Sequence, residues 1–314
     1  MIILLPFFTG MVWSAILALE YRRSDPARKM LMWFILANTG LMLIRALIVA
    51  GERESFDLIR CLYIFFLLVV FPVGYIYIRR LTSPVPASKS ELWLLAPAVG
   101  ASAAGVIAYF IALVDWHPIE IFARVILPIE VIMMAVFGEM AIRDYRHNIE
   151  NYYSDTTGKR QKPMYRLLSA YIIFSLFKSV ALSLGAPLNT DMVLVTVVSL
   201  CYTVLIFAVA YVGSKASFNA GNFALDIRKD ESEVLDHGTM IRVSELMRQK
   251  QLYLRPGLKI TDVAMELCSN RSYVSEYINR QFGMSFCDYI NSLRVEHAKS
   301  LISQNPECDL TDIY

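Results

Sequence analysis

The chain has 314 residues, of which 56% are hydrophobic and 18% are charged, and its mean hydropathy is +0.46. This composition excludes an ordinary soluble protein of two domains. The formal net charge is only +2, so the overall charge does not by itself indicate a nucleic-acid partner. Hydrophobicity is concentrated in residues 1–213, whereas residues 214–314 have the composition of a soluble protein.

Seven apolar runs in the first part are each long enough to cross a bilayer, which takes about 20 residues. The runs are residues 2–19, 30–50, 58–78, 92–114, 119–142, 165–185 and 191–213. The first run is not a cleaved signal peptide, because Arg22 and Arg23 follow it and no basic segment precedes it. We therefore predict an all-α fold in which residues 1–213 form a seven-span membrane domain.

Basic residues alternate between the polar joints of this domain. Lys and Arg side chains gather in the first, third and fifth joints, whereas the second, fourth and sixth are mainly acidic, with Arg53 as their one clear basic residue. The positive-inside rule then places the N-terminus outside and the C-terminal part in the cytoplasm. This orientation requires an odd number of spans, in agreement with seven.

Four of the charged residues inside the predicted spans are candidates for a ligand site. Arg45, Arg124 and Lys178 fall within roughly 15 Å of the outer surface at about 1.5 Å per helical residue, and Glu130 lies near the midplane. Ionisable residues at such depth usually face the bundle interior and mark a ligand or ion pathway. One hypothesis is an outward-open pocket that binds an anionic ligand, with Glu130 as the counter-charge. The alternative is that the long side chains extend to headgroups or form structural pairs.

Several classes of site lack their sequence motifs. The five cysteines show no CxxC spacing and the four histidines are dispersed, so we expect neither a metal site nor a disulfide framework. The last span has no lysine for a retinal Schiff base, and no phosphate loop, catalytic triad or HExxH is present. We expect no catalytic residues and no cofactor, and therefore not an enzyme.

A polar segment of mixed charge, residues 214–238, reads as a linker before a small helical domain at residues 239–314. Residues 240–252 predict an amphipathic helix with Ile241, Leu246 and Leu252 facing inward. A turn follows at Arg255-Pro256-Gly257.

Residues 260–283 have the pattern of a helix, a tight turn and a second helix. Thr261 is the expected N-cap of the first helix, and Asp262 in the first turn complements the helix dipole. Asn270 is the expected N-cap of the second helix, and Gly283 occupies the position of a C-terminal glycine. The apolar face of the first helix consists of Val263, Ala264 and Leu267.

The second helix separates apolar from polar side chains. Its apolar face is expected to contain Tyr273, Val274, Tyr277, Ile278 and Phe282. Its polar face is expected to contain Arg271, Ser272, Ser275, Glu276, Asn279 and Arg280. A face of Arg, Asn and Ser opposite a packed face is what a DNA recognition helix requires, because Arg pairs with guanine and Asn with adenine.

This stretch resembles the first helix-turn-helix of an AraC-type DNA-binding domain, and residues 283–302 resemble that family's long connecting helix. Family positions in the connecting helix are matched by Phe286, Tyr289, Arg294, Ala298 and Leu301. The resemblance covers roughly residues 240–314, and it implies that the six polar residues of the second helix contact bases and phosphates.

Two features depart from the family pattern. Cys268 stands where the family usually has a glycine with positive φ, which costs about 1 kcal/mol of strain if the turn is unchanged. Residues 310–314 repeat the pattern of residues 260–264, so we expect the chain to stop at the start of the second helix-turn-helix. Residues 240–314 carry nine Lys/Arg and nine Asp/Glu, a balance that weakens the DNA interpretation.

The resemblance implies a transcriptional regulator of the bacterial inner membrane, which senses a signal between its spans and binds DNA in the cytoplasm. Its expected partners are DNA, the lipid bilayer and a small, anionic ligand, and the assembly considered is a homodimer. The alternative is a membrane transporter or receptor with a vestigial cytoplasmic tail that does not bind DNA. No inverted repeat or pair of broken helices supports a transporter.

Overall fold

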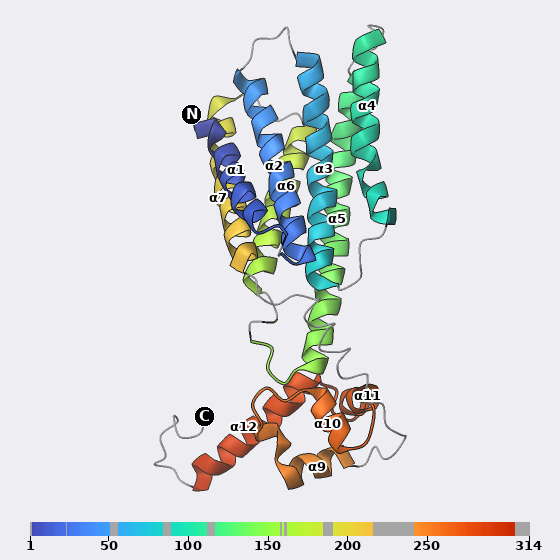
Figure 1. Cartoon of the computed structure of the whole chain (residues 1–314), viewed down its shortest axis with the longest axis vertical. Coiled ribbons are helices and arrows are strands. Elements are labelled where there is room, and N and C mark those ends of the chain that lie inside the picture. Colours follow the sequence, from blue (N-terminus) through green and yellow to red (C-terminus); the bar gives the residue numbers. More distant parts are fainter. Residues whose placement is uncertain are drawn as a thin grey trace. The chain divides into compact units, whose positions relative to one another are not determined.

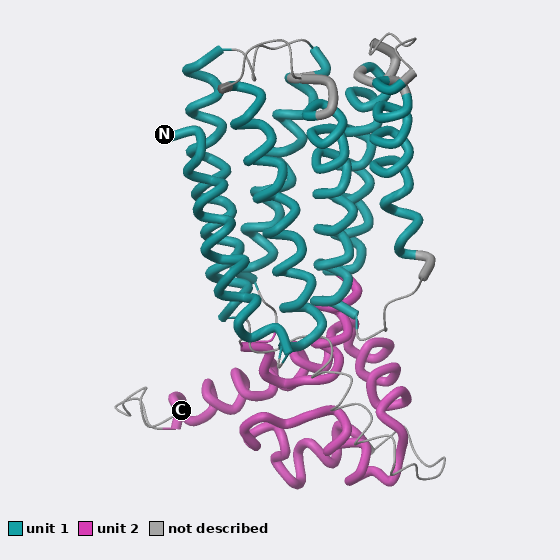
Figure 2. The backbone as a smooth tube through the Cα atoms, turned by 45° about the horizontal axis from the view of Figure 1, so that its top comes forward, with its two compact units in different colours: residues 1–142, 161–220 teal, residues 143–160, 221–314 magenta. Residues whose placement is uncertain are grey.

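The computed structural model describes residues 2–22, 24–50, 56–83, 89–111, 117–157, 159, 162–184, 191–215 and 242–304. The described residues form helices and connecting turns, with one isolated antiparallel bridge between Tyr153 and Lys259. The predicted all-α class is therefore confirmed for this part of the chain. The chain divides into two compact units, Met1–Ile142 with Gln161–Ala220 and Arg143–Arg160 with Gly221–Tyr314 (Figure 2).

The first unit is a bundle of long apolar helices (Figure 1). They are α1 (Leu5–Leu19), α2 (Pro26–Ala50), α3 (Phe56–Thr82), α4 (Ala96–Ile111), α5 (His117–Tyr152), α6 (Lys162–Ser183) and α7 (Met192–Lys215). Among the described residues, six helices are long and apolar enough to cross a membrane. The region of α4 is shorter, because its apolar stretch covers Glu91–Ile107 and begins in the 3-10 helix η3 (Lys89–Leu95). The seventh span therefore stays a prediction.

Small residues bring the helices of the first unit close together. Helix α2 packs against α1, α3 and α7, and α4 packs against α3. A Cβ added at Gly10 would lie 2.1 Å from Thr39 Oγ1, and one added at Gly74 would lie 2.6 Å from Met134 Cε. Such close approaches require glycine, as is common where membrane helices meet.

Helix α5 belongs to both units. It has 36 residues, whereas the predicted span ended at residue 142. The helix continues to Tyr152 because Arg143–Tyr152 contains no glycine or proline, although its apolar run has ended. Within the span, Pro128 cannot donate to the carbonyl of Arg124, and Ser183 Oγ on α6 donates to that oxygen at 2.9 Å instead.

The second unit consists of the end of α5 and several short helices: α9 (Arg242–Lys250), η4 (Leu252–Leu254), α10 (Ile260–Glu266), α11 (Arg271–Phe282) and α12 (Phe286–Gln304). The segment that follows α5 is part of this unit's framework. The Ser154 N–H donates to the Leu258 carbonyl at 3.0 Å, and Cys287 Sγ donates to the Ser154 carbonyl at 3.3 Å. Residues 143–160 therefore have structural contacts with the C-terminal domain that the sequence analysis did not predict.

The helix predicted at residues 240–252 is α9, but its buried side differs from the prediction. Val243 and Met247 are buried, one turn apart, whereas Leu246 is only half-buried. The helix ends at Lys250 and Gln251 takes a positive φ of 48°, so Leu252 belongs to η4 and is only half-buried. Ile241, most of the predicted linker and residues 310–314 lie outside the described residues.

Candidate nucleic-acid interface and membrane-domain pockets

Helices α10 and α11 are joined by the short turn Leu267–Asn270, whose local chemistry follows the sequence prediction. Asn270 Oδ1 accepts a hydrogen bond from the Ser272 N–H at 3.0 Å, which confirms Asn270 as the N-cap of α11. Cys268 has a φ of 49° and Gly283 has a φ of 67°, so both adopt the left-handed conformation expected of them. The turn is therefore built as predicted, with cysteine at a position that favours glycine.

The predicted N-cap of α10 was wrong. The N-cap is Lys259, and the Asp262 carboxylate accepts a hydrogen bond from the Lys259 backbone N–H at 2.8 Å. Thr261 lies inside the first turn and is buried at 6% exposure, because the helix begins at Ile260, two residues earlier than an N-cap at Thr261 would give. Asp262 nevertheless lies in the first turn, where a negative charge is favourable.

The buried face of α11 is narrower than its apolar pattern suggested. Val274 and Ile278 are 2% and 0% exposed, whereas Tyr273 and Phe282 are 38% and 37% exposed. Phe282 stacks on Tyr289 of α12 with ring centroids 4.7 Å apart, which fixes the end of α11 against the following helix. The predicted apolar face of α10 is confirmed, since all three of its residues are buried.

All six polar residues predicted on α11 line one cleft of about 560 Å³. They are Arg271, Ser272, Ser275, Glu276, Asn279 and Arg280. Two side-chain pairs on this face each join residues one helical turn apart. Arg280 Nη2 lies 2.7 Å from Glu276 Oε1, and Asn279 Nδ2 donates to Ser275 Oγ at 3.4 Å. The structure therefore brings together on one face every residue assigned by the resemblance.

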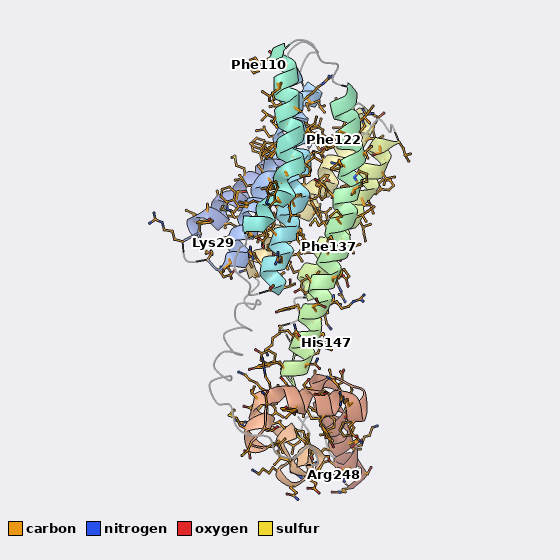
Figure 3. The ribbon with its side chains drawn as sticks, turned by 90° about the vertical axis from the view of Figure 1, so that its right-hand side faces the viewer. Lys29, Phe110, Phe122, Phe137, His147 and Arg248 are labelled. Atoms are coloured by element: carbon orange, nitrogen blue, oxygen red, sulfur yellow. The ribbon has the colours of Figure 1, made fainter. Side chains whose placement is uncertain are left out.

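The opposite wall of the cleft comes from the end of α5. It contains His147, Asn148, Asn151 and Tyr152, and Figure 3 labels His147 on this helix beyond Phe122 and Phe137. The side chains of Asn151 and His147 are hydrogen-bonded at 2.9 Å. Sequence analysis missed this wall, although the i, i+1, i+4, i+5 spacing of its four residues is that of one helix face.

A turn follows the end of α5. Asp155 Oδ1 accepts a hydrogen bond from the Thr157 N–H at 2.8 Å. This bond, followed by the positive charges of Lys159 and Arg294, lowers the pKa of Asp155, so its carboxylate is ionised and available as a turn-forming acceptor.

Of the four charged residues predicted to form one pocket, two lie close together in the structure. Arg45 and Lys178 are both buried and lie within electrostatic range of each other. Arg45 Nη1 donates to Ser199 Oγ at 3.4 Å, and Lys178 Nζ lies 5.0 Å from the centroid of the Tyr202 ring. This pair lies between α2, α6 and α7.

Glu130 lines a different cavity, of about 310 Å³, between α3, η3, α4 and α5, and neither Arg45 nor Lys178 lines it. The Arg124 side chain is exposed. Glu130 is on the side of α5 that lines this cavity together with residues of α3 and α4. Anion binding by Arg45 and Lys178 stays a prediction.

A buried polar chain runs beside the two cations and was not found by sequence analysis. Tyr171 Oη donates to Asn38 Oδ1 at 2.6 Å, and Asn38 Nδ2 donates to the Phe34 carbonyl at 2.9 Å. The hydroxyls of Ser175 and Tyr202 lie 3.5 Å apart. These side chains are neutral, and polar neutral residues at helical spacing do not stand out in an apolar sequence.

In the described part of the chain, His, Cys, Asp and Glu do not gather in groups of three that could hold a metal ion. Comparisons with protein-family models, with curated proteins and with solved structures found no match to this chain.

Proposed function

We propose that this protein is a membrane-integrated transcriptional regulator whose second unit binds DNA through an AraC-like helix-turn-helix. The single observation that carries the proposal is the polar face of α11, where all six predicted DNA-contacting residues line one cleft. The helix that bears this face is anchored from behind by Val274 and Ile278, so its polar side chains are presented by a packed scaffold.

The residue types on this face fit base recognition. Arg271 and Arg280 carry the forked donors that pair with guanine, and Asn279 carries the amide that pairs with adenine. Helix α11 has 12 residues, or about 18 Å, and a helix of this length can lie in a major groove about 12 Å wide. Glu276 either accepts from cytosine or orients Arg280, with which it forms an ion pair.

The α5 wall gives this interface a means of regulation. A cleft of about 560 Å³ does not admit a DNA duplex, so the end of α5 and the polar face of α11 must separate before the recognition helix enters the groove. Because α5 is also one of the six membrane-type helices, a signal that shifts this helix changes the population of the DNA-competent state.

The test begins with the full chain reconstituted in lipid nanodiscs and used to select binding sites from a random DNA library. The double variant Arg271→Ala with Asn279→Ala is then compared with wild type on the selected sequence. We expect a loss of affinity of about thirtyfold or more, because each of the two base contacts contributes about 1–3 kcal/mol. The matched control is Gln281→Ala, an exposed residue of the same helix outside the cleft.

Retained affinity in the double variant would remove this face from consideration. Failure of wild type to enrich any sequence would contradict the regulator proposal itself. Equal losses in the double variant and in Gln281→Ala would indicate damage to the helix rather than lost base contacts.

A further inference from the structure

A second cavity, in the first unit, contains a buried carboxylate that has no hydrogen-bond partner in the described part of the chain. Both carboxylate oxygens of Glu130 are inaccessible to solvent, and among the described residues neither has a hydrogen-bond partner. The cavity has a volume of about 310 Å³, and no Lys or Arg is among the described residues that line it. An ionised carboxylate buried without a partner costs several kcal/mol, so it is neutralised either by a proton or by a cation that comes from outside the walls of the cavity.

The remaining walls of this cavity are apolar and aromatic. Phe71, Tyr75, Trp93 and Phe137 line it, with Met133 and Met134 among the other residues. The rings of Tyr75 and Phe137 lie 6.3 Å apart at an interplanar angle of 59°. Aromatic faces attract cations, by about 2 kcal/mol when the pair is desolvated, and thioethers accommodate apolar groups of varied shape.

Ion pairs outside the cavity hold its η3 wall in position. Glu91 of η3 pairs with Arg80, and Arg79 Nη1 lies 2.9 Å from Glu91 Oε1. Both arginines are in the last turn of α3, so these bonds attach η3 to the helix that supplies Phe71 and Tyr75. Arg79 and Arg80 are therefore paired with Glu91, and among the described lining residues Glu130 is the one that carries a charge.

We propose that this cavity binds a small organic cation, an amine or quaternary ammonium attached to an apolar group. The ammonium pairs with the Glu130 carboxylate and the aromatic rings, and the apolar group packs against the methionines that line the cavity. A volume of about 310 Å³ is about twice the ~150 Å³ that holds one benzene ring, so it accommodates one ring and a small cationic head. This inference goes beyond the proposed function and does not depend on DNA binding.

The test uses benzyltrimethylammonium as the probe, because its charge is permanent and it dissolves in water. Binding to the full chain in nanodiscs is measured by calorimetry in the absence of DNA. We expect saturable binding to wild type and an affinity at least tenfold lower in Glu130→Gln, which keeps the shape of the side chain and removes its charge. Glu139→Gln, an exposed glutamate on the same helix, is the matched control and should bind as wild type does.

Two further measurements separate the contribution of the aromatic rings from that of the Glu130 charge. Phe137→Leu keeps an apolar side chain but removes one ring, and it should weaken binding several-fold while leaving the charge in place. Benzyl alcohol, which is neutral, should bind wild type and Glu130→Gln equally.

The proposal is overturned if wild type shows no saturable binding of the cation, or if the cation binds Glu130→Gln as tightly as wild type. A result of this kind would leave the DNA-binding proposal intact, because that is measured separately.

Discussion

Backbone conformation at single residues was the feature that sequence reasoning predicted best. Asn270, Cys268 and Gly283 adopt the capping and left-handed conformations assigned to them, because turn chemistry depends on neighbours in the chain. Thr261 was assigned wrongly for a related reason. Lys259 has no capping side-chain oxygen, yet the Asp262 carboxylate accepts from its backbone N–H, and a preference for Ser, Thr and Asn at the N-cap does not anticipate this arrangement.

Cys268 leads to a prediction about stability. Replacing it by glycine should raise the free energy of local opening of α10 and α11 by about 1 kcal/mol, because a side chain at a φ of 49° is strained. Amide hydrogen exchange of the full chain, followed by mass spectrometry of peptides from residues 260–283, measures this opening. Cys268→Ala retains a Cβ and serves as the control, so it should remain close to wild type. An equal gain in Cys268→Ala would assign the effect to the thiol rather than to the backbone.

At the scale of helices, apolar runs predicted where spans lie but not where helices end. The end of α5 has no apolar run, and only the lack of helix-breaking residues between Arg143 and Tyr152 indicated that the helix continues. The phase of α9 was also misjudged, since Val243 and Met247 rather than Leu246 are buried. In a short helix with few apolar residues, the buried side is decided by what packs against it, and that information is not local.

The end of α5 can be tested as an element that obstructs the α11 face. Asn148→Pro should interrupt the helix at a cost of about 3 kcal/mol and free the cleft wall, since proline removes a hydrogen bond within the helix. Under the proposed function we expect several-fold tighter DNA binding by the full chain, measured by fluorescence anisotropy with the selected sequence. Asn148→Ala removes the same side chain but keeps the helix, and any gain it shows should be smaller. Unchanged or weaker binding in Asn148→Pro would contradict the regulatory role of α5.

At the scale of the whole molecule, the sequence predicted how deep each charged residue lies along its span. It did not predict toward which neighbouring helix the side chain points. Arg45 and Lys178 were expected near each other and lie within electrostatic range, whereas Glu130 lines another cavity. Hydropathy gives the position of a residue along a span, and the rotation of that span depends on packing contacts such as the one between Gly74 and Met134. The candidate DNA face was predicted more completely because its six residues lie on one helix.

Membrane topology is the remaining expectation, and it depends on whether the α4 region crosses the bilayer. Reporter fusions after residues 86, 114 and 215 decide the question, with green fluorescent protein active in the cytoplasm and alkaline phosphatase active outside, where its disulfides form. Seven spans predict a fluorescent fusion after 86, a phosphatase-active fusion after 114 and a fluorescent fusion after 215. These three fusions place the α11 face in the compartment that holds the DNA.

A topology of six spans gives a different pattern. If the α4 region stays on the inner side, the fusions after 86 and 114 both fluoresce, and the fusion after 215 shows phosphatase activity. The N-terminus and residue 215 would then lie on the same side, because six is even, and α11 would have no access to DNA. That pattern would refute the regulator proposal, while cation binding at Glu130 would still be decided by calorimetry alone.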